Sequence, residues 1–264
     1  MFVCEMCNTT ICRKDNFKRH ATRCLFKNNN IHNEFKVKKQ NITLKVKPIG
    51  IGATVGLSKH SALFPNTIRA IIVGRSGCGK TNLLLNLICH ENGLKFSNVY
   101  IYSPTLFQNA YQHLDSVLAN VPNIGYFKYH SNDDTIPHPT EAKPNSLFIF
   151  DDVACDRQKR MAEYFCMARH NNIDVIYLMQ TYSKLPKQLI RDNSNFIILF
   201  EMDAMNLKHS YDDYVSCDMN FESFHNLCKK CWNSEKHGFL TINREKNKHG
   251  GKYSMGLDIN INPK

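Results

Sequence analysis

Apolar runs of five to seven residues recur along residues 68–200, separated by longer stretches of mixed polarity. Runs of this length that are rich in branched and aromatic side chains are typical of buried strands. Strands and helices alternate, which favours an α/β fold with a parallel sheet and helices on both faces. The expected strands are 68–73, 98–102, 147–152, 173–179 and 196–200, with a shorter one at 126–130, and the expected helices are 81–90, 106–119, 156–170 and 183–190.

The two ends of the chain follow other patterns. Towards the C-terminus, helices are expected at 204–215 and 219–231, and antiparallel additions to the sheet at 238–242 and 255–261. The first 65 residues lack the strand–helix alternation. The pattern therefore predicts three parts: a small module at 1–27, a basic linker and lead-in at 28–65, and the main α/β domain at 66–264.

The first expected strand stops at Gly74 and is followed by GRSGCGKT and a helix. This G-x-x-x-x-G-K-T pattern lies between an expected strand and an expected helix, which predicts a loop that binds the phosphates of ATP. The alternative is a glycine turn that matches the pattern by chance, and the strand–loop–helix context argues against it. Lys80 is expected to reach the β- and γ-phosphates, and the Thr81 hydroxyl to bind Mg²⁺. The predicted nucleotide-binding residues of the loop are Gly74, Arg75, Ser76, Gly77, Cys78, Gly79, Lys80 and Thr81.

Polar side chains close two further expected strands. Asp151 ends an apolar run, where a carboxylate is expected to bind Mg²⁺ directly or through water. Asp152 is predicted to polarise an attacking water, or else to cap the next helix. Gln180 is predicted to orient that water or to sense the γ-phosphate; the alternative is a turn residue. Ligands of parallel sheets bind at the carboxyl ends of the strands, where all of these residues fall.

Two arginines are candidates for a finger that enters the active site of a neighbouring subunit. Arg169 ends the helix before the fourth expected strand, and Arg191 lies in the loop before the fifth. Arg169 has the alternative role of a cation at a helix C-terminus, and Arg191 that of a surface residue.

Charge is distributed unevenly along the 264 residues. The net charge is +11, and residues 1–47 account for +8 of it, with 11 Lys/Arg against 3 Asp/Glu. A basic arm on a nearly neutral body indicates a polyanionic partner, most simply nucleic acid. A solvated tail or a localisation signal is the alternative.

The chain begins with a metal-ligand pattern, Cys4-x2-Cys7-x12-His20-x3-Cys24. This spacing predicts a ββα zinc finger with Cys in place of the last His, and Ile11 and Phe17 would supply its small core. So small a module would depend on Zn²⁺ for its folding energy.

If the finger docks on DNA in the usual way, three side chains of its helix face the bases. Arg pairs with guanine and Asn with adenine in the major groove, so base readout is chemically possible. Nonspecific backbone contact or a protein–protein role is at least as well supported, because one finger covers only about three base pairs. The candidate DNA-binding residues are Arg13, Asn16 and Arg19.

The remaining cysteines pose a second metal question. Cys228-x2-Cys231, with nearby Cys217, His225 and His237, has the composition of a zinc site, but the expected helix uses Cys228 as an apolar residue, which favours a core role. No apolar run reaches the length of a membrane span and the N-terminus lacks the apolar segment of a signal peptide, so an intracellular protein without membrane contact is expected.

One segment carries a family resemblance. ARHNNIDVIYLMQTYSKLPKQLIRDNSNFIILFEMD, residues 168–203, taken with GRSGCGKT and LFIFDD, resembles the poxvirus-type genome-packaging ATPases of the FtsK–HerA superfamily. Relatives occur in large DNA viruses and in Polinton/Maverick elements. The resemblance covers roughly residues 66–260, so the N-terminal finger is an addition to the shared core.

The resemblance implies a RecA-like core with strand order 5-1-4-3-2 and a ring-forming motor that pumps double-stranded DNA into a capsid. Gln180 would then face the γ-phosphate. The family often has Asp-Glu where this chain has Asp151-Asp152, a shorter base. A capsid or terminal protein is the implied partner, and the host nucleus, a cytoplasmic virus factory or the virion the implied location.

Two other function classes compete with the motor. In the first, a zinc-finger regulatory protein binds DNA and uses the nucleotide site as a switch. In the second, a small-molecule kinase transfers the phosphoryl group to an acceptor other than water. The paired carboxylates Asp151 and Asp152 argue against the kinase, since a kinase of this kind does not need the second one.

Overall fold

The computed structural model describes residues 2–3, 10–11, 58–130, 136–153 and 158–263. The chain divides into two compact units, Met1–Thr54 and Val55–Lys264. In the first unit, β1 (Phe2–Val3) and β2 (Thr10–Ile11) pair antiparallel. The rest of the predicted finger, including its four proposed zinc ligands and its three proposed DNA contacts, lies outside the described residues, so the finger stays a prediction. These residues are Cys4, Cys7, His20 and Cys24 for zinc, and Arg13, Asn16 and Arg19 for DNA.

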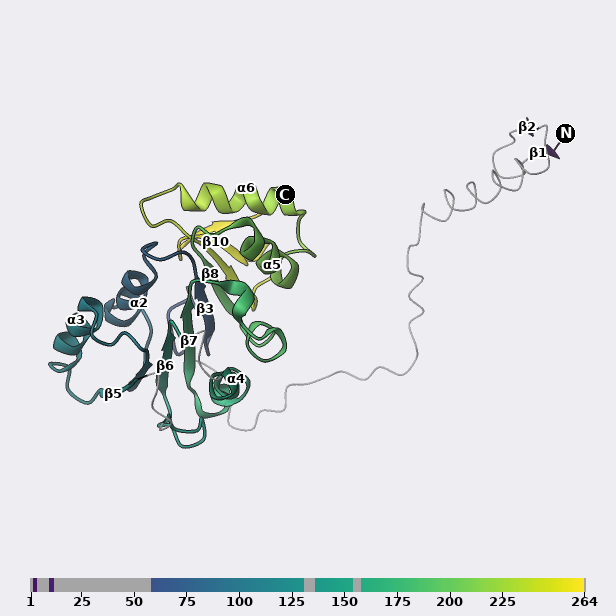
Figure 1. The fold of residues 1–264 in the computed structure, drawn as a ribbon. Helices are drawn as coiled ribbons and strands as arrows, with labels where there is room; N and C mark the ends of the chain where they lie inside the picture. Colours follow the sequence, from purple (N-terminus) through teal and green to yellow (C-terminus); the bar gives the residue numbers. More distant parts are fainter. Residues whose placement is uncertain (1, 4–9, 12–57, 131–135, 154–157, 264) are drawn as a thin grey trace. The chain divides into compact units, whose positions relative to one another are not determined.

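The second unit is built on a nine-stranded sheet of order β11-β10-β9-β8-β3-β7-β6-β4-β5. From β8 to β5 neighbouring strands are parallel, and β9, β10 and β11 extend the β8 edge in antiparallel fashion (Figure 1). The predicted order of the five main strands and the antiparallel additions are confirmed. The strands are β3 (Arg69–Val73), β4 (Asn98–Tyr102), β5 (Gly125–Tyr129), β6 (Ser146–Asp151), β7 (Asp174–Met179), β8 (Phe196–Leu199), β9 (Leu240–Asn243), β10 (Tyr253–Met255) and β11 (Ile259–Ile261).

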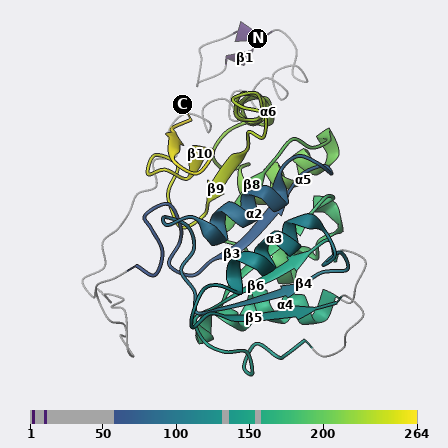
Figure 2. The same cartoon turned by 90° about the vertical axis from the view of Figure 1, so that its left-hand side faces the viewer.

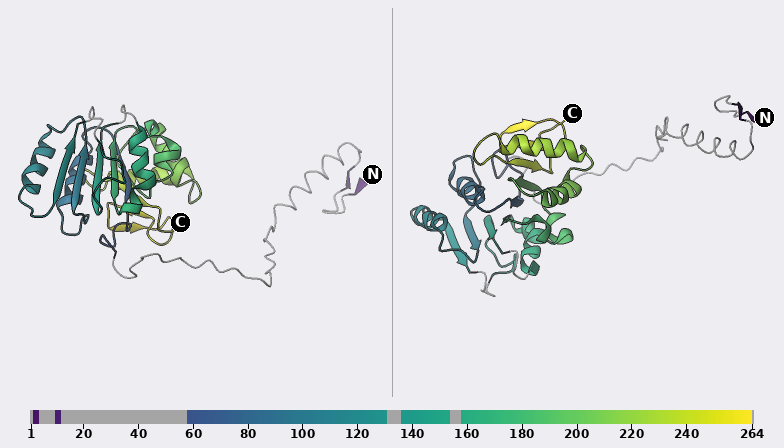
Figure 3. Two further views of the ribbon diagram at one scale, coloured as in Figure 1. Left: turned by 90° about the horizontal axis from the view of Figure 1, so that it is seen from below. Right: turned by 45° about the horizontal axis from the view of Figure 1, so that its top comes forward.

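Helices cover both faces of the sheet, as the alternation predicted. Alternate side chains of each strand point to opposite faces, which divides the core into two clusters. The helices α2 and α3 lie on one face (Figure 2), and α4, α5 and α6 pack on the other (Figure 3). Their bounds are α2 (Lys80–Cys89), α3 (Asn109–Leu118), α4 (Gln158–Met167), α5 (Ala204–Tyr214) and α6 (Phe221–Trp232).

Two of the expected helices differ from the prediction. The segment expected to be helical to residue 170 leaves α4 at Met167 and continues as the 3-10 turn η1 (Ala168–Asn171). The helix expected at 183–190 is a 3-10 turn, η2 (Tyr182–Lys184), followed by a π turn, η3 (Lys187–Arg191). Pro186 separates them because it lacks an N–H and forces the preceding residue into extended geometry.

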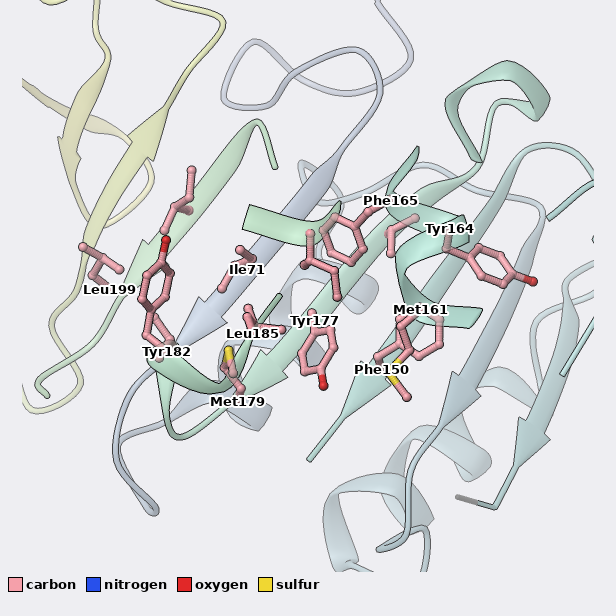
Figure 4. Packing of buried hydrophobic residues seen from close by; sticks show 14 of the residues in the cluster. Ile71, Phe150, Met161, Tyr164, Phe165, Tyr177, Met179, Tyr182, Leu185 and Leu199 are labelled. Carbon is pink, nitrogen blue, oxygen red and sulfur yellow. The ribbon is translucent and has the colours of Figure 1, made fainter. Parts of the chain in front are cut away.

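An aromatic cluster holds the centre of the sheet against α4. The rings of Phe150 on β6 and Tyr164 on α4 are 5.6 Å apart, and Tyr177 on β7 is 6.1 Å from Phe150 (Figure 4). Burial of each such side chain contributes roughly 1.5–3 kcal/mol. Since β6 and β7 are buried along their whole length, the residues at their carboxyl ends are held on a rigid frame.

The lead-in segment is fastened to the sheet by the fully buried carboxylate of Asp174. Its oxygens accept hydrogen bonds from Lys59 Nζ (2.7 Å), His60 Nε2 (3.0 Å) and the Ile68 amide (2.8 Å). The amide of Lys95 donates to His60 Nδ1 at 3.0 Å, so Nε2 is the ring nitrogen that donates to Asp174. Asp174 therefore closes a buried network that joins four segments of the chain.

Replacement of Asp174 by Ala is expected to destabilise this unit by about 3–5 kcal/mol, because it removes the acceptor shared by His60, the Ile68 amide and the partly buried Lys59, which keeps the Asn172 carbonyl as a partner. The measurement is the urea dependence of unfolding. Asp212→Ala is the matched control: Asp212 pairs with Lys208 at 2.8 Å, but both side chains are about half exposed. Its loss should cost only about 0.3–0.5 kcal/mol. If both substitutions lowered the free energy of unfolding equally, the stabilising role of the buried Asp174 network would be wrong.

Candidate active site

The glycine-rich loop leaves β3 between the two neighbouring strands. The Gly74 amide donates to the carbonyl of Met179 at the end of β7, and the Arg75 amide donates to that of Glu201, just after β8. Gly77 and Gly79 have φ values of 73° and 110°, the left-handed region that residues with a side chain adopt only at a cost. The loop is thus anchored at its base and turned by its glycines.

The loop continues into the N-terminus of α2, which begins at Lys80. Gly79 is its N-cap and supplies no side-chain cap, so the first amides of the helix are not satisfied by a capping side chain. Such a helix end attracts a phosphate group. Lys80 Nζ donates to the carbonyls of Gly74 (2.7 Å) and Arg75 (2.9 Å), which holds the ammonium group over the loop.

A cleft of about 280 Å³ opens beside this loop. It brings together the residues that sequence reasoning placed at three separate strand ends. Among the predicted residues, Ser76, Gly77, Gly79, Lys80, Thr81, Asp151, Asp152 and Gln180 line it, and it is completed by Asn82, Thr105, Gln108, Leu178 and Met179. The predicted loop residues Gly74, Arg75 and Cys78 do not line the cleft.

Asp151 ends β6 and is 7% exposed. Its Oδ2 accepts a hydrogen bond of 2.5 Å from the hydroxyl of Tyr111 on α3. Burial raises the pKa of the Asp151 carboxyl above its ordinary value, while the Tyr111 hydrogen bond and the charge of Lys80 act in the opposite direction. The carboxylate is therefore held in one orientation at the rim of a polar cleft.

Asp152 has an unusual backbone for a residue with a side chain. Its φ is 55°, in the left-handed region, and its amide donates to the Leu178 carbonyl. Aspartate tolerates this conformation better than most residues, and such outliers concentrate at functional sites. Gln180 Nε2 lies 3.5 Å from each carboxylate oxygen of Asp152, so the amide and the second carboxylate face each other across the cleft.

A family model described as Poxvirus A32 protein matches residues 58–229 of the chain. The chain belongs to this family. The predicted resemblance to viral packaging ATPases is therefore confirmed. The phosphate loop and the strand-end carboxylates line one cleft, and this A32-family protein is a nucleotide-binding ATPase of the P-loop class. Among curated proteins, none is significantly similar to it.

Solved structures that this chain matches include the genome packaging NTPase B204 from Sulfolobus turreted icosahedral virus 2. Its complex with AMP is 14% identical, with 73% of this chain and 98% of that chain covered and a TM-score of 0.49. Its complex with sulfate is 16% identical, covering 68% and 92%, with a TM-score of 0.47. The large terminase of a thermophilic bacteriophage is 11% identical, covering 44% and 34%, with a TM-score of 0.34.

Sequence reasoning missed one wall of the site in this A32-family chain. Thr105 and Gln108, from the turn between β4 and α3, line the cleft, and Tyr111 reaches Asp151 from α3. A signal was present, since β4 is parallel to β6 and its carboxyl end meets the same edge of the sheet. The polar residues that follow β4 were therefore candidates by the argument that selected Asp151.

His237 is a second residue that sequence reasoning did not assign to the site. Its Nδ1 lies 3.1 Å from the Cys78 carbonyl, so the ring donates this hydrogen bond. A side chain at Gly79 would meet the same imidazole at about 3.0 Å. The segment between α6 and β9 thus packs directly on the phosphate loop and supports its shape.

The two candidate finger arginines have different surroundings. Arg169 is exposed in η1, just before β7 begins, so it lies at the opposite end of the strands from the cleft. It cannot reach the active site of its own subunit and stays a candidate finger for the active site of a neighbouring one. Arg191 is 12% exposed, and its Nη1 donates to Asp213 Oδ2 at 2.7 Å. Its guanidinium also stacks over the Tyr182 ring at 5.1 Å. Through these contacts Arg191 links η3 to α5 within its own subunit. The predicted role as an arginine finger does not fit them.

The second zinc site considered for the C-terminal helices is not supported. Within the described ranges, no three His, Cys, Asp or Glu side chains gather as a metal site. Cys228 and Cys231 are fully buried, and Cys217 is exposed. Burial raises the pKa of Cys228 well above its ordinary value and that of Cys231 to about 11, which opposes the thiolate that zinc requires. The core role favoured by the sequence fits these observations.

Among the described residues, no helix combines the length and the apolar character that a membrane span requires.

Proposed function

We propose that this protein is an ATP-hydrolysing translocase that packages double-stranded viral DNA into a capsid, built on a RecA-like core. The observation that carries the proposal is the single cleft at the carboxyl edge of the parallel sheet, where Lys80, Asp151, Asp152 and Gln180 converge in an A32-family chain. Membership of the family supports the packaging role, and the chemistry of the cleft supports hydrolysis.

In this proposal the loop and the N-terminus of α2 bind the phosphates through backbone amides, and Lys80 contacts the β- and γ-phosphates. Gln180 holds a water molecule. Asp152 accepts a proton from this water as the water oxygen attacks the γ-phosphorus. The bond between the γ-phosphorus and the bridging oxygen then breaks, and ADP and phosphate leave. Asp152 and Gln180 face each other closely enough to share one water.

The donors of the cleft fit Mg²⁺, which prefers oxygen ligands. The Thr81 hydroxyl and the Asp151 carboxylate line the cleft, and Asp151 keeps Oδ1 for the metal while Oδ2 is bonded to Tyr111. When bound, Mg²⁺ would neutralise charge on the β- and γ-phosphate oxygens. Zn²⁺ is proposed only for the N-terminal module, through Cys4, Cys7, His20 and Cys24.

DNA is the proposed partner for the basic N-terminal region, whose net charge of +8 over residues 1–47 suits a polyanion. Arg13, Asn16 and Arg19 are proposed to contact DNA. We further propose a ring of identical subunits, with Arg169 as the candidate finger, and a capsid or terminal protein as the remaining partner.

The test is steady-state ATP hydrolysis with and without double-stranded DNA, for the wild type and for Asp152→Asn. The expected result is several-fold stimulation of the wild type by DNA, weaker at high salt, and no DNA-stimulated rate in the variant. Sizing in the presence of ATP and DNA should give a ring. A monomer or dimer with negligible turnover, unchanged by DNA, would contradict the motor and favour the regulatory switch instead.

A further inference from the structure

One hydrogen bond ties α3 to Asp151 at the edge of the cleft. The hydroxyl of Tyr111 donates to Asp151 Oδ2 at 2.5 Å, and the two residues are 0% and 7% exposed. They are 40 positions apart in the chain. Thr105 and Gln108, which precede Tyr111, line the same cleft, so this stretch of the chain reaches the site at more than one point.

A core role alone does not explain this contact. The ring of Tyr111 packs with the apolar side chains of α2, α3 and the adjacent sheet face, and phenylalanine would fill that space equally well. A buried hydroxyl needs a hydrogen-bond partner, but many buried tyrosines satisfy theirs with a backbone carbonyl. Tyr164 does so here, donating to the Pro137 carbonyl at 2.9 Å. Tyr111 instead contacts the carboxylate that lines the nucleotide cleft.

A carboxylate with one oxygen held in place has little freedom to rotate. With Oδ2 bonded to Tyr111, Oδ1 is left for the cleft that Asp151 lines. Partners that orient a metal ligand typically change metal affinity or activity by about 10–100-fold when removed. The geometry is that of a buried phenol that holds one oxygen of a carboxylate at the edge of the cleft.

We propose that Tyr111 is a positioning residue that presents Asp151 Oδ1 to the Mg²⁺ of bound nucleotide. This inference rests on the proposed function, because it takes Asp151 as the metal-binding carboxylate. It adds a role for α3, whose placement on the sheet becomes a condition for metal binding. Displacement of α3 would then weaken metal binding without touching the phosphate loop.

The test is binding of a fluorescent ADP analogue to Tyr111→Phe over a range of Mg²⁺ concentrations. The Mg²⁺ concentration at half-maximal enhancement of binding is expected to rise by about 10–100-fold. Binding in EDTA should stay unchanged, which shows that the nucleotide site is still folded. Tyr126→Phe is the matched control: the Tyr126 hydroxyl donates to Asp115 Oδ1 at 2.8 Å, away from the cleft, and its Mg²⁺ dependence should equal that of the wild type.

A double mutant with Asp151 distinguishes loss of carboxylate orientation from a general loss of protein stability. In an Asp151→Asn background, Tyr111→Phe should cause no further change in Mg²⁺ dependence, since the oriented carboxylate is already gone. If Tyr111→Phe alone leaves the Mg²⁺ dependence unchanged, or weakens binding equally in EDTA, the positioning role is wrong. If the wild type binds ADP without any Mg²⁺ dependence, the proposed metal site itself fails.

A measurement on the wild-type fold covers the case in which Tyr111→Phe does not fold. With 3-fluorotyrosine at position 111, the fluorine resonance is expected to shift when Mg²⁺ is added to the ADP-bound protein. The same label at position 126 should not respond. A label at 111 that is insensitive to Mg²⁺ would overturn the inference.

Discussion

Replacement of Lys80 by alanine is expected to lower kcat for ATP hydrolysis by about 10²–10³-fold or more, the cost of removing one donor aimed at developing charge. In the structure the ammonium group lies over the loop, bonded to the carbonyls of Gly74 and Arg75. Of the described residues that line the cleft, Lys80 is the one with a cationic side chain, and we propose that it contacts the β- and γ-phosphates. Steady-state phosphate release from purified protein measures the effect.

The fold should survive this substitution. Lys80 Nζ bonds to the carbonyls of Gly74 and Arg75 and to Cys78 Sγ at 3.9 Å, all within the loop, and the loss of these contacts is expected to change the free energy of unfolding by about 1 kcal/mol or less. Lys95→Ala is the control, since Lys95 is an exposed lysine outside the cleft and its loss should leave kcat unchanged. Lys80→Arg keeps the charge but alters its shape and reach, so it should also be strongly impaired. A Lys80→Ala protein with half of the wild-type rate would exclude the proposed phosphate contact.

The parallel sheet and the meeting of the motifs at one edge were predictable because they depend on local rules, whereas the order of the main strands was implied by the family resemblance. Alternating strands and helices imply a parallel sheet, and the carboxyl ends of parallel strands meet at one edge. Lys80, Asp151 and Gln180 each follow a strong apolar run, so their meeting in one cleft followed from topology without knowledge of any side-chain contact. In the order β8-β3-β7-β6-β4, the strand before Gln180 lies between the strand before the phosphate loop and the strand that ends in Asp151.

Contacts between segments distant in sequence were not predictable in this way. Tyr111 looks like an ordinary apolar position of an amphipathic helix, and only the docking of α3 on the sheet brings its hydroxyl to Asp151. The pairing of Arg191 with Asp213 likewise depends on where α5 returns to the sheet. In each case the polar partner is chosen by tertiary packing, which periodicity does not encode.

Backbone geometry supplies the other missing information. The sequence places two carboxylates where β6 ends, but it does not show that the first is buried while the second turns out at a φ of 55°. This turn separates their environments: Asp151 is held by Tyr111 and Asp152 faces Gln180. Two adjacent carboxylates in unlike surroundings are suited to unlike roles.

Asp152→Asn is expected to lower kcat by about 10²–10⁴-fold, the usual contribution of a general base, with little change in nucleotide affinity. Asparagine tolerates the left-handed backbone at this position as well as aspartate does, so the substitution removes the base without straining the turn. Gln180 can still hydrogen-bond to the amide oxygen. Single-turnover hydrolysis, with nucleotide affinity measured in parallel, separates the chemical step from binding.

Asp152→Glu distinguishes a proton acceptor from a residue that only shapes the turn. Glutamate restores the carboxylate and is the residue that packaging ATPases of this type often carry, so the variant should retain activity well above that of Asp152→Asn. If Asp152 served only the backbone, the order would reverse, because asparagine adopts positive φ more readily than glutamate. Equal activity of Asp152→Asn and the wild type would remove Asp152 from the reaction and leave water activation to another group in the cleft.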